Sequence, residues 1–316
     1  MSNSSHPLEG IIIRSTGSYS TVQVAGGDAF ECRLKGRFRM EGIKTTNPLS
    51  VGDKVIFFLE KGKSTGIITT IHPRTNYIIR KATRLSKVSH IIASNIDRLF
   101  VIASIIQPRT STGFIDRVLV TAEAYHIPAT IVFNKIDISD KAAKQQLDQL
   151  MELYSGIGYG VFAVSAITRE GLDALNVALA GKVSLFTGHS GVGKSALINA
   201  IEPRLNIRTG DISSYHHKGK HTTTFAEMHC LAFGGYIIDT PGIKEFGLID
   251  FASQEICERF PEMRERMHDC HFANCTHVHE PGCAIKQALD EGKINKGRYQ
   301  NYLGMLNDDK LDATDY

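Results

Sequence analysis

The sequence predicts a multidomain α/β protein. An all-β OB-fold barrel comes first, a P-loop domain with a doubly wound sheet lies in the centre, and a mostly helical metal-binding region follows. Three observations predict this order: short alternating apolar segments before residue 72, a glycine-rich phosphate-binding loop near the middle, and a cysteine and histidine cluster after residue 267. With 316 residues, the chain is long enough for two or three domains. We expect these domains at residues 1–72, 73–248 and 249–316.

The first region reads as a small β-barrel. Its apolar segments are separated by Gly-Gly, Asn-Pro and Gly-Asp turns. About five short strands in some sixty residues suit an OB-fold, a common oligonucleotide-binding architecture. The clearest segments are residues 10–13, 21–24, 54–58 and 66–71.

Basic residues are concentrated in and after this barrel, although the net charge of the whole chain is only +3. No acidic residue lies between Lys61 and Asn95, and a second basic group forms an alternating strand pattern. This asymmetry indicates a nucleic-acid-binding face, with an unliganded, solvated basic face as the alternative. The basic residues are Lys61, Lys63, Arg74, Arg80, Lys81, Arg84 and Lys87, together with Arg33, Lys35, Arg37 and Arg39.

The middle of the chain contains a complete phosphate-binding pattern, G-x-x-x-x-G-K-[ST], between a buried strand at 183–187 and a helix opened by Ala196. Glycine is needed because backbone N–H groups must close around phosphate oxygens, which a Cβ would obstruct. Lys194 is expected to neutralise the β- and γ-phosphates, and Ser195 to bind Mg²⁺ through its hydroxyl. An ordinary glycine-rich loop is the alternative. The loop consists of Gly188, His189, Ser190, Gly191, Val192, Gly193, Lys194 and Ser195.

A base-reading motif precedes the phosphate loop. Asn134, Lys135 and Asp137 follow the apolar run 130–133, and ligands bind at the C-terminal ends of strands in open α/β sheets. The Asp137 carboxylate can accept hydrogen bonds from N1–H and the 2-amino group of guanine, which adenine lacks, so the motif favours GTP over ATP. Ser165 and Ala166, after the run 161–164, resemble the loop that packs against the other edge of guanine. A helix N-cap at Asp137 is the alternative.

Two further elements lie downstream. Asp239 and Gly242 belong to a D-x-x-G element after an apolar run, where Asp239 is expected to hold the Mg²⁺ shell and the Gly242 N–H to contact the γ-phosphate. Three consecutive threonines precede it, and among them Thr223 is the favoured Mg²⁺ ligand, although adjacent threonines leave this choice open.

The motifs occur in the order base, base, phosphate loop, switch one, switch two, whereas ordinary small GTPases begin with the phosphate loop. This rotation indicates a circular permutation, with the new join near residues 179–182. Ile243 occupies the position after D-x-x-G where a water-orienting Gln is common, so slow intrinsic hydrolysis is expected. His221 is the candidate catalytic residue, and a solvent-exposed loop histidine is the alternative.

A pattern C-x4-C-x-H-x5-C begins at Cys270 and continues with Cys275, His277 and Cys283. Three thiolates and one imidazole can close a tetrahedral structural zinc site. Spacing alone leaves His268, His271 and His279 as competing ligands. The uneven cysteines do not suggest a disulfide framework, and no apolar run of 18 residues or signal peptide is present, so we expect a cytoplasmic protein.

The rotated motif order, the preceding barrel and the C-x4-C-x-H-x5-C element together resemble the ribosome small-subunit-dependent GTPase A (RsgA) family over nearly the whole chain. The resemblance implies a GTP/GDP cycle with Mg²⁺, one Zn²⁺ on Cys270, Cys275, His277 and Cys283, and a role in late maturation of the small ribosomal subunit. It also implies that this subunit and its rRNA stimulate GTP hydrolysis. A monomer without DNA or membrane partners is expected.

Three other functions fit parts of the pattern. They are an ATP-using phosphotransferase, against which Asp137 argues, a non-enzymatic nucleotide-gated RNA-binding module, which Ile243 favours, and a translation-cycle GTPase that acts on mature ribosomes.

Overall fold

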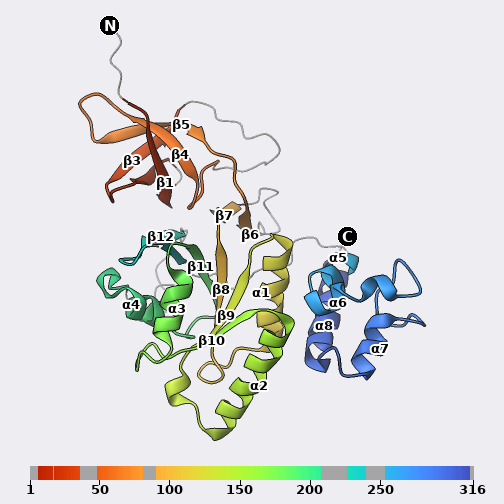
Figure 1. The fold of residues 1–316 in the computed structure, drawn as a ribbon. Coiled ribbons are helices and arrows are strands. Elements are labelled where there is room, and N and C mark those ends of the chain that lie inside the picture. Colours follow the sequence, from red (N-terminus) through yellow and green to blue (C-terminus); the bar gives the residue numbers. More distant parts are fainter. Residues whose placement is uncertain are drawn as a thin grey trace.

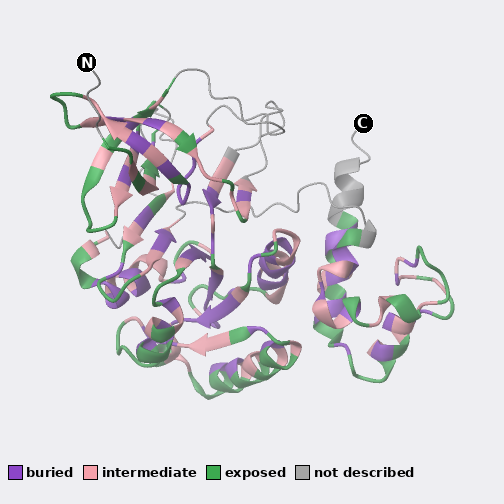
Figure 2. Ribbon diagram, turned by 45° about the horizontal axis from the view of Figure 1, so that its top comes forward, coloured by how far each residue is buried: buried purple, intermediate pink, exposed green. Residues whose placement is uncertain are grey.

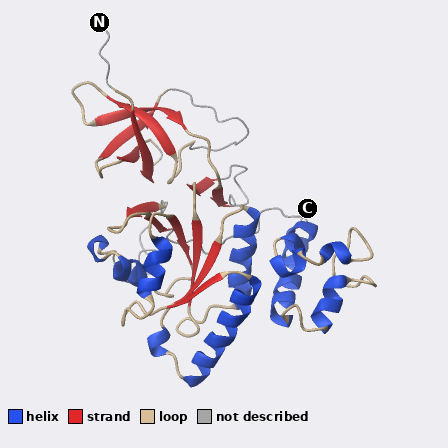
Figure 3. Ribbon diagram, in the orientation of Figure 1, coloured by secondary structure: helices blue, strands red, loops and turns tan. Residues whose placement is uncertain are grey.

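The computed structural model describes residues 6–16, 18–35, 48–80, 90–207, 226–239 and 253–313. A small barrel, a central α/β domain and a group of helices follow one another along the chain (Figure 1). Within the described residues, the third part contains helices and loops and no strand (Figure 3). Among the described helices, none has both the length and the apolar character that crossing a membrane requires.

The N-terminal barrel is closed. Strand β1 pairs with both β2 and β4, β2 pairs with β3, and β3 and β4 both pair with β5, so five strands form a ring. Alternate residues fill its interior, including Ile12, Val22, Phe57 and Ile68. The barrel predicted from the sequence is therefore confirmed. Its strands are β1 (Leu8–Ser15), β2 (Ser20–Val24), β3 (Ala29–Leu34), β4 (Lys54–Leu59) and β5 (Thr65–Ile71).

The central sheet has the strand order β10-β9-β8-β11-β13-β12, in which all pairs are parallel except β12 with β13. Neighbouring residues of a strand belong to different cores: Leu99 and Val101 pack on one face, Phe100 and Ile102 on the other. Figure 2 shows the central strands as largely buried. The strands are β8 (Arg98–Ala103), β9 (Ala129–Phe133), β10 (Gly160–Ala163), β11 (Val183–Thr187), β12 (Glu227–Cys230) and β13 (Tyr236–Asp239).

Helices cover both faces of this sheet, which confirms the predicted doubly wound arrangement. Residues of α1 and α2 join the first core, and residues of α3 and α4 join the second. The strand before the phosphate loop, β11, lies in the middle of the sheet although three of the sheet's strands precede it in the chain. The helices are α1 (Thr112–Ala124), α2 (Lys141–Ile157), α3 (Leu172–Leu179) and α4 (Lys194–Ile201), with 3₁₀ turns η1 (Ile136–Ile138) and η2 (Pro203–Leu205).

The barrel and the central domain meet at two places. Arg14 of β1 pairs with Glu227 of β12, so the two sheets are continuous. The short hairpin of β6 (Tyr77–Arg80) and β7 (His90–Ser94) lies between the two parts. Beside it, the Asn95 side chain donates to the Gly52 carbonyl at 2.9 Å.

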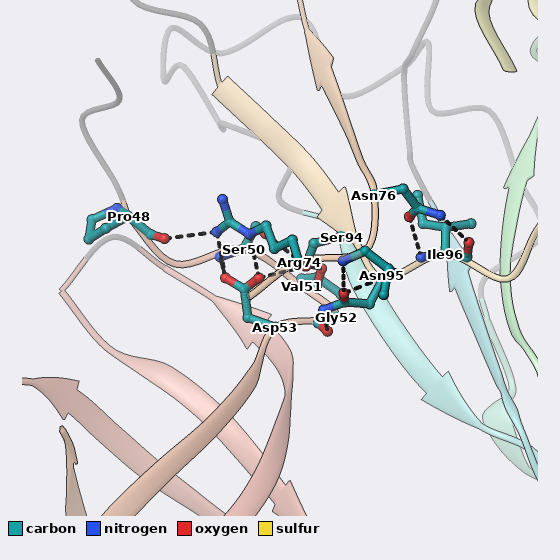
Figure 4. Close-up of polar contacts among 11 residues, drawn as sticks. Pro48, Ser50, Val51, Gly52, Asp53, Arg74, Asn76, Ser94, Asn95 and Ile96 are labelled. Atoms are coloured by element: carbon teal, nitrogen blue, oxygen red, sulfur yellow. Dashed lines mark hydrogen bonds and ion pairs between the residues drawn. The ribbon is translucent and has the colours of Figure 1, made fainter. Parts of the chain in front are cut away.

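A buried ion pair fixes this second contact (Figure 4). The Arg74 guanidinium donates to both oxygens of Asp53, at 2.6 and 2.7 Å, and to the Pro48 carbonyl at 2.9 Å. The Ser94 hydroxyl and the Ser50 N–H also donate to Asp53, at 2.6 and 2.9 Å. The side chains of Arg74 and Asp53 are 5% and 0% exposed.

Arg74 was predicted to belong to the basic nucleic-acid-binding face, and this prediction is wrong. Its charge is neutralised inside the junction by a carboxylate that lies 21 residues away in sequence. Arg33 is exposed but bonds to Glu60 at 2.7 Å, and Lys63 lies 3.5 Å from the same carboxylate. The strand predicted around residues 33–39 ends at Leu34, and Arg37 and Arg39 lie outside the described residues, as do Lys81, Arg84 and Lys87.

The C-terminal helices form a separate small core around Phe260, Met263 and Tyr302. Val120 of α1 belongs to the same core, so this region packs directly on the central domain. Figure 1 shows α8 on the side of the molecule that α1 faces. The elements are α5 (Ser253–Glu258), α6 (Pro261–Arg264), the 3₁₀ turn η4 (Met267–Asp269), α7 (Ala284–Asp290) and α8 (Lys296–Ala313).

Candidate nucleotide and metal sites

The phosphate loop connects β11 to α4 and depends on three glycines. Gly188, Gly191 and Gly193 have φ values of 154°, 82° and 93°, a region that favours glycine. A Cβ at Gly188 would collide with the Ile102 carbonyl of β8, and one at Gly193 would lie 2.5 Å from the Asn134 amide nitrogen. Glycine at these two positions therefore lets the loop pack closely against β8 and the base motif, the tight turn that a phosphate-binding loop requires.

Lys194 lies at the start of α4 and folds back over this loop. Its ammonium donates to the carbonyls of Gly188 at 2.6 Å and His189 at 3.1 Å. Burial lowers the Lys194 pKa, while the charge of Asp239 opposes this shift. The two hydrogen bonds place the ammonium against the loop, and because burial disfavours its charged form, phosphate oxygens would stabilise it there. Ser195 and Ala196 follow in the first turn of α4, and both are half-buried.

His189 of the phosphate loop contacts helix α1. Its ring stacks against Phe114 of α1 with 3.8 Å between centroids. Burial and then the positive charge of Lys194 lower its pKa, which favours the neutral ring. Ser190 is exposed at the tip of the loop, and Val192 is buried in the core.

The base motif is bonded to the phosphate loop across the sheet edge. The Asn134 amide donates to the Val192 carbonyl at 3.0 Å and accepts from the Ala166 N–H at 3.2 Å. Lys135 donates to the Gly191 carbonyl at 2.7 Å. Three segments that are distant in sequence therefore form one site.

Asp137 is presented to solvent within this site. It is exposed, and the buried Ser165 hydroxyl donates to its Oδ1 at 2.6 Å. The N–H groups of Ile167 and Thr168 donate to that hydroxyl in turn, at 3.2 and 3.0 Å. A carboxylate held by one oxygen beside a phosphate loop is arranged to accept hydrogen bonds from a base.

Sequence reasoning missed the segment that leads into α1. Lys135 also donates to the Gln107 carbonyl, at 2.6 Å, and a Cβ at Gly191 would lie 3.4 Å from Pro108. Together with Phe114, these residues cover one side of the phosphate loop. Gln107, Pro108 and Phe114 belong to no motif with a fixed spacing, so the sequence contained no signal that could identify them.

Of the residues predicted downstream of the phosphate loop, Asp239 lies within the described part of the chain. Asp239 ends β13 and pairs in register with Phe186 of β11, next to the phosphate loop. His221, Thr223 and Gly242 lie outside the described residues.

The cysteine and histidine cluster forms in the C-terminal region. The ligand atoms of Cys270, Cys275, His277 and Cys283 all lie within 4.8 Å of one another. The Nδ1 atom of His277 faces the thiols of Cys270 and Cys283, at 3.5 and 3.4 Å. Burial raises the pKa of the Cys275 thiol, so a bound cation would be needed to favour the thiolate there. Three thiols and one imidazole that converge in a largely buried site fit zinc.

The loop that carries His277 is held independently of these four groups. Glu280 accepts from the Thr276 N–H and hydroxyl, at 2.7 and 2.6 Å, and from the N–H groups of Val278 and His279, both at 3.0 Å. This carboxylate stabilises the turn in which His277 adopts a left-handed φ of 60°.

Comparisons with known proteins agree with this geometry. The chain matches the RsgA N-terminal domain over residues 9–68 and the RsgA GTPase family over residues 71–249. It is 49% identical over 301 residues to a small ribosomal subunit biogenesis GTPase RsgA of Bacteroides fragilis, covering 95% of this chain and 97% of that protein. A Flavobacterium johnsoniae protein of the same name is 50% identical over 305 residues, covering 96% of this chain and 94% of that protein.

Two solved structures resemble the whole chain. The crystal structure of YjeQ from Thermotoga maritima has a TM-score of 0.78 and 32% identity, and covers 96% of this chain and 98% of that chain. YloQ, described as a circularly permuted GTPase, has a TM-score of 0.75 and 31% identity, and covers 97% of this chain and 96% of that chain.

Proposed function

The chain belongs to the RsgA family of GTPases and is a GTP hydrolase, and on this premise we propose that it binds the small ribosomal subunit and assists its late maturation. Hydrolysis of GTP to GDP and phosphate is slow in the isolated protein and is stimulated by the subunit. One observation carries the assignment of the site: Asn134 and Lys135 of the base motif bond directly to the phosphate loop.

In this proposal the nucleotide lies across the C-terminal ends of β9 and β11. Asp137 reads the guanine edge, while Ser165 and Ala166 orient Asp137 and Asn134. The N–H groups of residues 188–196 surround the phosphates, and Lys194 exchanges its bonds to loop carbonyls for phosphate oxygens. Mg²⁺ would neutralise phosphate charge, held by Ser195, Asp239 and Thr223, with the Gly242 N–H at the γ-phosphate.

Water activation is assigned to the switch region. Ile243 has no hydrogen-bonding group, so the site depends on another residue to orient water. His221 next to the threonine run is our candidate, oriented by contact with rRNA. Mutation to Ala is expected to leave GTP affinity nearly intact and to remove most of the subunit-stimulated turnover. Unchanged stimulated turnover would discard this role.

The barrel and the C-terminal region have separate proposed roles. The barrel and its exposed lysines Lys61 and Lys63 are proposed to contact rRNA. Zn²⁺ on Cys270, Cys275, His277 and Cys283 would be structural, because the four protein groups leave no open position. We propose domains at 1–72, 73–248 and 249–316, and a monomer without DNA partners. We also propose a cytoplasmic location, since a reducing compartment suits cysteines without disulfide bonds and ribosome binding.

The decisive experiment measures phosphate release from GTP over many turnovers, with and without purified small subunits. Stimulation that ATP does not share supports the proposal. Equal use of ATP would favour a phosphotransferase, and nucleotide binding without turnover would favour a gated RNA-binding module. Precursor and mature subunits, assayed in parallel, separate a maturation factor from a translation-cycle GTPase.

A further inference from the structure

The first turn of α1 lies between the phosphate loop and the C-terminal helix α8. This turn begins after the segment 104–111, and the Ser111 hydroxyl caps it by accepting from the Phe114 N–H at 3.2 Å. Residues on different sides of the turn contact the two neighbours. The turn is therefore a physical connection between the nucleotide site and the C-terminal region.

On one side, the turn supports the phosphate loop. The Phe114 ring stacks against His189 with 3.8 Å between ring centroids. In the segment just before it, the Gln107 carbonyl accepts from Lys135, which also bonds the Gly191 carbonyl. A displacement of this turn would therefore disturb the loop residue His189.

On the other side, α8 holds the turn. Asn301 donates to Asp116 Oδ2 at 2.6 Å and to the Thr112 hydroxyl at 3.3 Å. Arg298 donates to Asp116 Oδ1 at 2.6 Å, and the side chains of Arg298 and Asp116 are 1% and 0% exposed. Groups this deeply buried and this fully bonded allow little independent movement.

Arg298 is itself fixed within the C-terminal region. It donates to both Glu262 oxygens, at 2.8 and 2.9 Å, and its guanidinium lies 4.6 Å from the centre of the Phe260 ring. Helix α8 also binds the metal-site loop: the hydroxyls of Tyr302 and Tyr299 donate to the carbonyls of Thr276 and His277, at 2.8 and 2.6 Å. The contacts thus run from the cysteine cluster through α8 and α1 to the phosphate loop.

We propose that Arg298 and Asn301 are positioning residues for the nucleotide site, which act through the first turn of α1 on His189 and the phosphate loop. The proposal rests on the assignment of residues 188–195 as the nucleotide site. Because coupling between two binding sites is reciprocal, an rRNA contact that shifts α8 changes nucleotide affinity, and nucleotide binding changes the affinity of the C-terminal region for rRNA by the same factor.

The test measures binding of a fluorescent GDP derivative with Mg²⁺ to the full chain, with thermal unfolding recorded for every variant. Asn301→Ala removes the contacts of α8 with Asp116 and Thr112, and Phe114→Leu removes the ring that stacks on His189. Each is expected to weaken GDP binding by roughly threefold to tenfold. The double variant should bind GDP about as tightly as the single variant with the larger defect, because both substitutions break the same series of contacts. Phe114→Tyr, which keeps the ring, should restore wild-type affinity.

Arg264→Gln is the matched control. Arg264 belongs to the same C-terminal region and bonds Glu123 of the same helix α1 at 2.9 Å, but in its last turn, away from the phosphate loop. Its GDP affinity should stay within about twofold of wild type.

The outcomes are distinguishable. Lower unfolding temperatures with unchanged GDP affinity in Asn301→Ala and Phe114→Leu would show a purely structural contact and overturn the proposal. The proposal would also be overturned if the fold-losses of GDP affinity in the two single variants multiplied in the double variant, because the two residues would then act independently. If Asn301→Ala fails to fold, Phe114→Leu still tests the contact through which α8 must act, and unchanged GDP affinity in that variant would overturn the proposal. Failure of the wild-type protein to bind GDP would instead remove the proposed nucleotide site on which the inference rests.

Discussion

Within the residues that the structure describes, each junction of the central domain contains a buried arginine–aspartate pair. Arg74 and Asp53 join the barrel to the start of the central sheet, and Arg298 and Asp116 join the C-terminal helices to α1. The first pair spans 21 residues and also includes Ser50 and Ser94, which donate to Asp53. The second spans 182 residues and also includes Glu262 and Asn301.

The first pair therefore joins segments close in sequence, and the second joins segments far apart in sequence. Both pairs neutralise a buried carboxylate, which is costly to leave unpaired. Asp53 directly precedes β4 of the barrel and bonds to Ser94 at the end of β7, whereas Asp116 lies in the helix whose first turn contacts the phosphate loop. The C-terminal junction is therefore expected to affect the nucleotide site, and the barrel junction is not.

Metal removal should disrupt the C-terminal junction most strongly. Structural zinc contributes on the order of 10 kcal/mol in small zinc domains, and here the metal-site loop is bonded to α8 through Tyr299 and Tyr302. We expect a strong chelator to increase hydrogen exchange throughout residues 253–307, and to leave the barrel strands unchanged. Native mass spectrometry confirms metal loss, and unchanged exchange after that loss would contradict the prediction.

Loss of the Arg298 side chain is expected to have the next largest effect. Arg298→Met leaves two carboxylates, those of Asp116 and Glu262, without their cationic partner. It should lower the free energy of unfolding by about 3–5 kcal/mol. Denaturant titration measures this change. An effect below about 1 kcal/mol, the range of surface pairs, would show that the network does not stabilise the junction.

Arg74→Met should be less damaging and local. It leaves one carboxylate, Asp53, without its cation, whereas Arg298→Met leaves two. Because Asp53 keeps the donors Ser94 and Ser50, we expect a loss of about 2–3 kcal/mol. Binding of the small subunit should weaken because the barrel is no longer fixed, while GDP affinity stays at the wild-type value. A GDP defect equal to that of Asn301→Ala would remove the distinction between the two junctions.

The smallest effect is expected from the exposed pair of the C-terminal junction. The Arg264 side chain is 46% exposed, so its bond to Glu123 is screened by solvent. Arg264→Gln should change the free energy of unfolding by less than about 1 kcal/mol. A loss as large as that of Arg298→Met would mean that the whole surface of this junction, and not the buried network, provides its stability.

The fold class and the main clusters could be predicted because each has a local pattern. Short alternating strands indicated the barrel, and the flanks of residues 188–195 indicated a strand and a helix. The cysteine spacing indicated the four groups that converge in the structure. In each case the residues that define the feature are close in sequence or follow a fixed period.

The junctions could not be predicted, since they depend on partners that only the fold brings together. Arg74 counted as a surface cation because its partner Asp53 lies outside the basic segment. Phe114 and Asn301 lie in ordinary helical sequence, and their contacts with His189 and Asp116 follow from helix packing. Charge counts record how many ionisable groups a segment holds, but not which of them are buried.

The pairing of Arg14 with Glu227 has a consequence for solubility. Strand β12 is the last strand of the central sheet, and at Glu227, its first residue, its outer side pairs with Arg14 of β1 in the barrel. Backbone groups on an uncovered outer strand recruit strands from other molecules and promote aggregation. A chain shortened to begin after the barrel would expose that side of β12, so the barrel also shields its neighbour from self-association.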